Sequence, residues 1–192
     1  MLVDPRQAGV TVTAFQTVDG RSAAHLRFDD VEVKPEAVLA TEAAAVIEAV
    51  VQDAIIALSA EAVGAMGALI ARTAEYAGTR KQFGVPIASF QAVAHRLADM
   101  KIAGAKARAT LLYTTALAEA GRAGPRDLAI LKGQVGVLGT AIGEAAVQTH
   151  GGIGMTDELA IGHYLKRLLA IDGLFGASDY HFRRLGMGFA AA

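Results

Sequence analysis

Two short polar segments of the chain combine residue types that bind phosphate or nucleotide groups. The first, residues 80–84 (RKQFG), is followed by Gln91 and offers a guanidinium, an ammonium, an amide and an aromatic ring. An arginine in a loop can hold two phosphate oxygens at once, because its planar fork presents parallel N–H donors. The same composition is typical of a solvated basic loop between two helices. These residues alone therefore leave a phosphate clamp and a plain surface loop both open.

The second segment is residues 148–154, QTHGGIG. Its glycines let a ligand approach the backbone closely, and the Gln148 amide can pair with an amide or a purine edge. The segment follows a predicted helix rather than a strand, and no Lys-Ser or Lys-Thr follows it. It is therefore neither the dinucleotide fingerprint nor a Walker loop. On spacing alone, a glycine that ends a helix at its C-cap is the favoured interpretation.

Polar residues also gather near the C-terminus, but their spacing predicts surface pairs. His163 and Arg167 are i,i+4 neighbours on a predicted helix, as are Asp179 and Arg183. The other polar residues of this stretch are Lys166, Asp172, His181 and Arg184. No two histidines stand at metal-ligand spacing beside a carboxylate, so we predict no metal site. Hydrolase chemistry finds no support, because the chain has neither a G-x-S-x-G elbow nor a Cys–His pair.

The composition limits the kinds of partner. The chain has 192 residues, 53% of them hydrophobic and 19% charged, with a formal net charge of −1. The high apolar content excludes disorder, and the balanced charge gives no field for nucleic acid. Without cysteine there is no disulfide framework, which favours a cytoplasmic location. The first residues lack a basic region followed by an apolar run, so we expect no signal peptide.

Residues 54–71 form the most apolar stretch and could be tested as a membrane span. Glu61 lies in the middle of it, and Asp53 and Arg72 bound it closely. Its apolar content is mostly alanine and glycine rather than leucine and phenylalanine. We therefore predict a buried helix of a multi-helix core and no membrane partner.

The elements that must position these residues fall into two parts. Residues 10–15, 24–28 and 31–33 have strand-like patterns, separated by turn signals at residues 19–20 and 29–30. Three short strands cannot bury a face by themselves. We expect residues 1–38 either to pair with another chain or to be the remnant of a β-domain.

From residue 39 onward the pattern is helical. Helices are predicted over residues 41–78, 89–121, 126–150, 158–171 and 178–185, with Thr41 as the first N-cap and a loop at 79–86. Helices this long with short connections favour an antiparallel bundle. The predicted fold is all-α, a four-helix-type antiparallel bundle over residues 39–192 after a short β remnant.

The order of these features resembles the C-terminal part of the acyl-CoA dehydrogenases. Residues 28–33 (FDDVEV) resemble the end of that family's middle β-domain. The long helix, RKQFG with Gln91, and QTHGGIG resemble its C-terminal four-helix domain, so the resemblance covers essentially the whole chain. It implies an FAD-dependent oxidoreductase that acts on an acyl-CoA and assembles as a homo-oligomer.

The resemblance also implies residue roles. The arginine of the family's RxxFG motif, here Arg80, binds the FAD pyrophosphate of a neighbouring subunit. Residues that would contact the same nucleotide are Gln82, Phe83 and Gln91. The QxxGG segment, which lies against the adenosine end, supplies Gln148, Gly151 and Gly152.

The expected catalytic base is missing. The family removes an α-proton from the thioester with a carboxylate while the β-hydride passes to flavin. The usual glutamate comes directly before a glycine after the last long helix, and Phe175 occupies that position in residues 174–177. Some members of the family carry the glutamate on the first long helix beside an arginine, and the matching residues here are Ala54 and Ile55, with Ala54 at the alternative position. Asp53 would point about 100° off that face. Asp172 is the other nearby carboxylate. We therefore predict no catalytic residue in this chain.

Three hypotheses about function follow. The first is the FAD-contacting and oligomer-forming domain of an acyl-CoA dehydrogenase-like flavoprotein, assembled as a dimer or tetramer. The second is a non-catalytic subunit that pairs with a related, competent subunit in a mixed oligomer. The third is a helical interaction module without a ligand, in which Arg80→Ala would change nothing.

Overall fold

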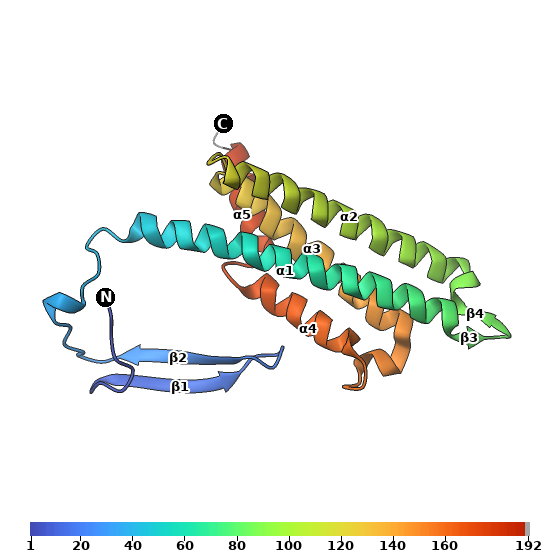
Figure 1. Cartoon of the computed structure of the whole chain (residues 1–192), viewed down its shortest axis with the longest axis horizontal. Coiled ribbons are helices and arrows are strands. Elements are labelled where there is room, and N and C mark those ends of the chain that lie inside the picture. The colour runs from blue at the N-terminus through green and yellow to red at the C-terminus, as the bar shows by residue number, and fades with distance from the viewer. Residues whose placement is uncertain (191–192) are drawn as a thin grey trace. The chain divides into compact units, whose positions relative to one another are not determined.

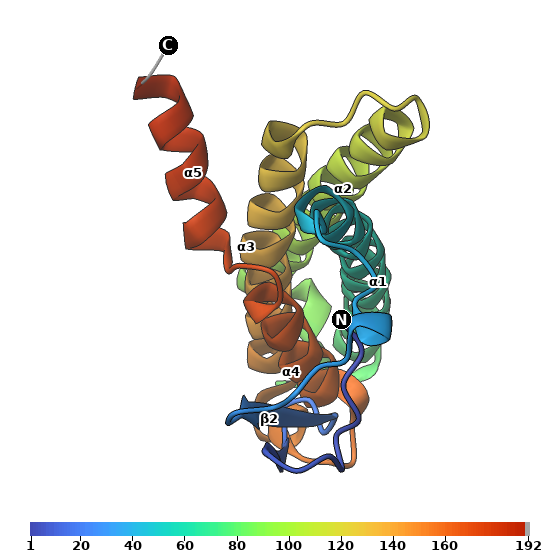
Figure 2. The same cartoon turned by 90° about the vertical axis from the view of Figure 1, so that its left-hand side faces the viewer.

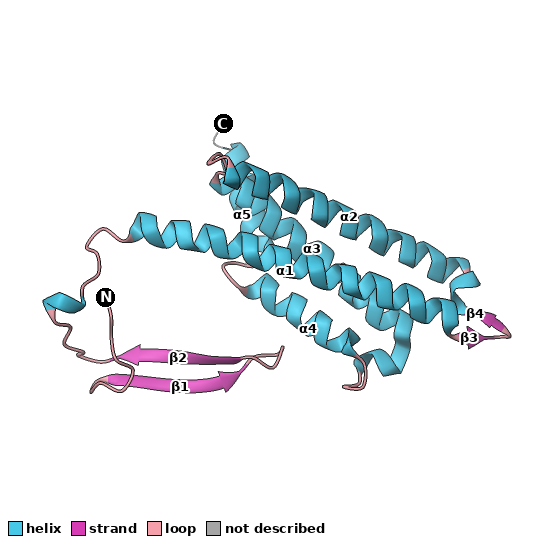
Figure 3. Ribbon diagram, in the orientation of Figure 1, coloured by secondary structure: helices cyan, strands magenta, loops and turns pink. Residues whose placement is uncertain are grey.

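The computed structural model describes residues 1–190 of the chain. They form two compact units, Met1–Val51 and Gln52–Ala192, and the division falls inside the long helix α1 (Ala44–Thr79). Figure 3 shows the strands β1 and β2 in the first unit and the helices that dominate the second. The domain boundary predicted after residue 38 is not tested by this division and stays a prediction.

The first unit contains one antiparallel hairpin. Strands β1 (Val10–Gln16) and β2 (Ser22–Phe28) pair in a register that sets Val10 opposite Phe28 and Gln16 opposite Ser22. The third predicted strand, residues 31–33, is wrong. No strand lies beside β2 on that side within residues 1–190, and an extended segment without a ladder partner is not a strand.

The predicted start of the first helix is also wrong. A short 3-10 turn, η1 (Pro35–Ala37), precedes a coil, and α1 begins at Ala44 rather than near Thr41. The Ala43 carbonyl accepts the first helical hydrogen bond, from the Ile47 N–H at 2.9 Å. Thr41 therefore lies two residues too early to cap the helix.

The second unit is a bundle of helices (Figure 1). After α1 come a small hairpin, β3 (Lys81–Gln82) with β4 (Val85–Pro86), and a 3-10 turn, η2 (Ile87–Ser89). Four helices and a third 3-10 turn follow: α2 (Gln91–Glu119), α3 (Pro125–His150), η3 (Gly151–Met155), α4 (Ala160–Gly173) and α5 (Ser178–Ala190). Each predicted helix is present, and the all-α fold class with a small β remnant is confirmed.

Helix α3 lies at the centre of this unit and packs against α2, α4 and α5. Figure 2 shows it between α2 and α5. Its start is fixed by Pro125 in the first turn and by the Asp127 carboxylate, which accepts from the Gly124 N–H at 3.0 Å. The buried core it shares with its neighbours consists of Ala62, Ala65, Met66, Leu69, Met100, Ala107, Leu131, Val135, Ile142, Ala146, Ile161, Leu168 and Ile171.

Two glycines of α3 allow the later helices to approach closely. A Cβ atom on Gly136 would lie 1.9 Å from Asp172 Oδ1 and 2.1 Å from Ser178 Oγ. A Cβ on Gly143 would lie 2.6 Å from Leu165 Cδ1. These distances are far inside van der Waals contact, so a side chain at either position would displace the Asp172, Ser178 or Leu165 side chain that packs against α3.

Helix α1 is the one helix of the described chain that is long and apolar enough to cross a bilayer, a test that core helices of soluble proteins also pass. Its buried side chains follow a helical spacing: Ile55, Ser59, Ala62, Ala65, Met66, Leu69, Thr73 and Ala77. Several of them belong to the shared core of the second unit, as the sequence predicted for this stretch.

We expect Gly136→Ala to destabilise the bundle by about 1–3 kcal/mol, because the new methyl group must displace the Asp172 carboxylate or the Ser178 hydroxyl. The measurement is the free energy of unfolding in urea. Gly64→Ala is the matched control, since a Cβ there meets nothing within 4 Å. It should stabilise α1 by about 0.5–1 kcal/mol. Equal effects of the two substitutions would contradict the close packing of α3.

Candidate functional site

The RKQFG segment forms the tight hairpin that joins α1 to α2. The Arg80 N–H continues the helix by donating to the Tyr76 carbonyl at 2.8 Å. The Ile87 N–H donates to the Arg80 carbonyl at 2.8 Å and closes the hairpin from the other side. Between them Lys81 pairs with Pro86 and Gln82 with Val85, so the segment is a fixed structure rather than an open loop.

The tip of this hairpin is Phe83-Gly84. Both residues have positive φ, +53° and +84°, which is the geometry of a two-residue type I′ turn. The Phe83 ring is 92% exposed and lies edge-to-face with the Phe90 ring, at 6.1 Å between centroids. A large apolar ring held outward by a rigid turn is a surface that a ligand or another chain can cover.

The hairpin brings cationic and amide groups to one end of the helix pair. Arg80, Lys81 and Gln82 are exposed, and Gln91 is the first residue of α2 and also exposed. The N-terminus of a helix carries a partial positive charge and unpaired N–H donors. Together with the Arg80 guanidinium, these groups form a surface suited to a phosphate or another anion.

The QTHGGIG segment ends α3. Gly151 adopts φ +67° as the C-cap of the helix, and its N–H donates to the Val147 carbonyl. The predicted helix C-cap is therefore confirmed, and η3 follows it directly. Gln148 lies exposed on the last turn, and Gly151 and Gly152 are exposed beside it. The bare backbone of these two glycines is open to close approach by a ligand.

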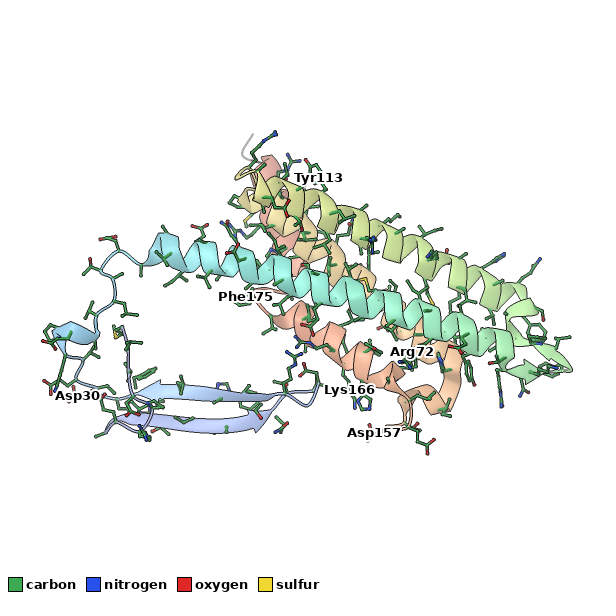
Figure 4. All side chains as sticks on the ribbon, in the orientation of Figure 1. Asp30, Arg72, Tyr113, Asp157, Lys166 and Phe175 are labelled. Atoms are coloured by element: carbon green, nitrogen blue, oxygen red, sulfur yellow. The ribbon has the colours of Figure 1, made fainter. Side chains whose placement is uncertain are left out.

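A partly buried stack joins the end of α1, just before the RKQFG segment, to the QTHGGIG segment. The Tyr76 and His150 rings lie 4.3 Å apart and nearly parallel, and the Tyr76 hydroxyl donates to the His150 carbonyl at 3.4 Å. His150 Nδ1 lies 2.8 Å from the Ala146 carbonyl. Arg72, labelled in Figure 4, and Thr79 line a small cavity beside this stack. Sequence analysis missed this link, because Tyr76 belongs to no motif and its partner lies 74 residues away.

The third location is the turn between α4 and α5, which carries Phe175 (Figure 4). Phe175 has φ +55° and its side chain is 45% exposed. Neither the Leu174 nor the Phe175 side chain can accept a proton. The expectation that the chain carries no catalytic base stays a prediction.

A buried lysine holds this turn from behind. Lys132 is 1% exposed, and its Nζ donates to the Asp172 carbonyl at 2.7 Å and to the Gly176 carbonyl at 2.9 Å. Burial lowers the pKa of the Lys132 ammonium below its ordinary value, and the Asp172 carboxylate 3.9 Å away opposes that shift. Sequence analysis did not single out Lys132. The one signal was a lone cation in the apolar run of residues 128–138.

The alternative base position on α1 offers no carboxylate either. Ile55 is buried and Ala54 is half-buried, while Asp53 is exposed to solvent. Glu61 lies further along α1, but both of its oxygens accept from Arg167, at 2.6 Å from Nε and 2.7 Å from Nη2. Glu61 therefore ties α1 to α4 instead of standing ready to accept a proton.

The predicted surface pair between His163 and Arg167 is wrong. Arg167 is only 14% exposed and reaches α1, where its Nε and Nη2 donate to the two oxygens of Glu61 as a bidentate pair across the helices. His163 instead lies 3.6 Å from Asp157. The predicted pair between Asp179 and Arg183 is confirmed at 2.6 Å. Within residues 1–190, no three histidine or acidic side chains are grouped closely enough to hold a metal ion.

The sequence matches one protein-family model and several proteins of known sequence. The family model described as "Acyl-CoA dehydrogenase, C-terminal domain" matches residues 44–189. Acyl-CoA dehydrogenase IpdE2 of Mycolicibacterium smegmatis is 36% identical over 128 residues, which are 67% of this chain and 40% of that protein.

Two solved structures have closely similar folds. The ChsE4-ChsE5 complex from Mycobacterium tuberculosis superposes with a TM-score of 0.88 at 29% identity, over 99% of this chain and 51% of that chain. The structure "PigA with FAD and proline" superposes with a TM-score of 0.89 at 25% identity, over 98% and 50%. The chain thus spans about half the length of these structures, and 40% of IpdE2.

We expect Arg167→Ala to lower the free energy of unfolding by about 1–2 kcal/mol, because it leaves the Glu61 carboxylate without its bidentate partner. Arg183→Ala is the control, since the Asp179–Arg183 pair is exposed and should contribute about 0.5 kcal/mol or less. Urea denaturation of both variants measures the difference. An equal loss for both would show that the Glu61–Arg167 pair does not tie the helices together.

Proposed function

Because the chain belongs to the acyl-CoA dehydrogenase family, we propose that it forms the C-terminal helical domain of an FAD-dependent oxidoreductase. The reaction of the complete protein is the α,β-dehydrogenation of an acyl-CoA thioester. This chain contributes cofactor binding and subunit assembly to that reaction. It supplies no catalytic base of its own.

The hairpin that ends in Phe83 is the observation that carries this proposal. A type I′ turn presents an aromatic ring that is 92% exposed, on the same short hairpin as the exposed Arg80 and just before the first turn of α2. An aromatic ring next to cationic N–H donors suits a dinucleotide, which has both a planar base and phosphates. A plain solvated loop has no reason to hold a phenylalanine outward.

The residues of the two segments fit FAD. Arg80 binds the pyrophosphate as a bidentate donor, and the residues that contact the same nucleotide are Gln82, Phe83 and Gln91. The exposed Gln148 and the bare backbone of Gly151 and Gly152 lie against the adenosine end. Bound FAD supplies the hydride acceptor of the reaction. The similar fold of the PigA structure, which contains FAD, supports this assignment.

Assembly with a second subunit belongs to the same proposal. The exposed Phe83 and Phe175 rings leave apolar surface in water that a neighbouring subunit and its bound nucleotide can cover. A homo-oligomer, a dimer or a tetramer, in the cytoplasm is the simplest form. The fold similarity to the ChsE4-ChsE5 complex supports association with a related subunit as the alternative.

A second candidate function is a non-catalytic subunit within a mixed oligomer. Phe175 at the glutamate position and Ala54 at the alternative position favour it, because neither side chain accepts a proton. In such an assembly the hairpin end of this chain completes the cofactor site, and the partner provides the carboxylate.

We expect Arg80→Ala to weaken FAD binding by the full assembly about tenfold or more, because a charge-assisted bidentate contact with the pyrophosphate is lost. Gln148→Ala should weaken it less, because a neutral amide contributes a weaker hydrogen bond. The measurements are the flavin absorbance of the purified protein, its mass in solution, and a titration with FAD. Arg122→Ala, which removes an exposed arginine just beyond α2, is the matched control and should bind FAD as the wild type does.

Wild-type affinity for FAD in both Arg80→Ala and Gln148→Ala would refute the cofactor assignment. It would favour the helical interaction module without a ligand. A flavin spectrum near one FAD per chain, together with a mass above that of the monomer, would support the proposal.

Phe175→Glu tests the missing base. If the turn between α4 and α5 faces the reacting acyl group, a carboxylate there should restore α-proton removal and raise turnover of acyl-CoA substrates. The assay follows flavin reduction by a panel of acyl-CoA thioesters. Phe175→Gln is the control, because it has nearly the same shape as the glutamate but accepts no proton. Equal turnover of the two variants would count against this position facing the reacting carbon.

A further inference from the structure

The turn between α4 and α5 holds a strained backbone. Phe175 adopts φ +55° and Gly176 φ +96°. The left-handed conformation is unfavourable for a residue with a bulky side chain and persists only where its surroundings impose it. The bonds that impose it here come from three helices.

Helix α3 contributes Lys132. Its buried Nζ bonds the Asp172 carbonyl before the turn and the Gly176 carbonyl within it, at 2.7 and 2.9 Å. A lysine is almost never fully buried without such partners, and each of these bonds is charge-assisted. Lys132 therefore fixes the distance between the end of α4 and the turn.

Helix α5 contributes His181, which is 4% exposed. Its Nε2 lies 3.1 Å from the Phe175 carbonyl. Because a carbonyl only accepts, Nε2 must carry the hydrogen. The opposite nitrogen, Nδ1, is buried and has no hydrogen-bond partner among the described residues. The ring is satisfied as the neutral Nε2–H tautomer, and a second proton on Nδ1 would be buried without an acceptor.

Helix α4 contributes Asp172. Its Oδ1 accepts from the Ser178 N–H at 3.1 Å and from the Ser178 hydroxyl at 2.5 Å. A carboxylate at this position satisfies a free N–H donor at the start of α5 and complements the helix dipole. The turn is thus held on both sides of Phe175.

We propose that Lys132 and His181 are positioning residues that determine where the side chain of residue 175 points. That the side chain points at the acyl group in the assembled flavoprotein rests on the proposed function. In this chain the bonds from Lys132 and His181 direct the exposed Phe175 ring toward that group. In the Phe175→Glu variant they would direct a carboxylate to the same place.

The positioning should depend on pH through His181. Burial lowers the pKa of its ring below the ordinary value of 6.5, as do the charges of Lys132 and Arg184. The bond to the Phe175 carbonyl and the Asp172 carboxylate oppose that shift. The folded turn therefore holds a proton on His181 less well than the unfolded chain does. The bond from His181 to the Phe175 carbonyl is therefore fully present above pH 6.5 and is lost as the pH falls through the lowered pKa of the ring.

The chain has no tryptophan, so Phe175→Trp introduces a single fluorescent reporter at the turn. The measurements are its emission maximum, anisotropy and quenching by acrylamide in the full chain at pH 7.5. We expect Lys132→Met, added to the reporter, to shift the emission to the red, lower the anisotropy and increase quenching. Lys166→Met, which changes an exposed lysine of α4, is the matched control and should leave the signal unchanged.

Two substitutions of His181 separate positioning from packing. His181→Gln keeps an N–H donor near the position of Nε2 and cannot be protonated, so it should retain the signal of the reporter and abolish its change below pH 6.5. His181→Leu should behave like Lys132→Met at every pH. His163→Gln, at an exposed histidine of α4, should leave the pH profile as it is.

An unchanged reporter in both Lys132→Met and His181→Leu would overturn the proposal, provided that far-UV circular dichroism shows intact helices. If Lys132→Met loses its helices, His181→Gln decides, because a pH profile that survives in it would overturn the role of His181.

Addition of FAD tests the proposed function separately from the positioning role of Lys132 and His181. A chain that binds FAD without quenching the reporter would refute the placement of residue 175 in the acyl site. An assembled protein that binds no FAD would refute the proposed function and leave the fluorescence result standing.

Discussion

The backbone of α3 must approach α4 and α5 more closely than any side chain would allow. The Asp172 carboxylate and the Ser178 hydroxyl occupy the space where a Cβ of residue 136 would lie. This proximity lets the buried Lys132 ammonium reach two carbonyls at the turn beyond α4. One missing methyl group therefore permits both the packing of the last two helices and the bonds that hold their connection.

The two candidate functional locations lie at opposite ends of α4. QTHGGIG and η3 precede the helix, whereas Phe175 follows it, and 14 residues in between span about 21 Å. Because α4 is tied to α1 by Glu61 and Arg167, the two locations keep a fixed distance.

Two aromatic side chains that a self-sufficient monomer would bury are exposed: Phe83 at the tip of the hairpin, and Phe175 at the turn between α4 and α5. The Phe83 ring is held outward by a turn whose backbone tolerates few other conformations, and the Phe175 ring is held by bonds from three helices. Each of these conformations costs free energy in the isolated chain. A ligand or a second subunit that covers the rings buries their apolar surface, and the free energy of that burial offsets the cost of the strained backbone. The local strain therefore favours assembly.

The helices could be predicted from the sequence, because apolar spacing and glycine or proline stops are local signals. RKQFG, QTHGGIG and the absence of a carboxylate at residue 175 can also be read along the chain. Three features became visible only in the folded chain: the burial of Lys132 behind the turn that carries Phe175, the stacking of Tyr76 on His150, and the pairing of Arg167 with Glu61. These contacts join residues from 44 to 106 positions apart. No pattern along the chain encodes such distances, since they depend on which helix faces meet once the core is packed.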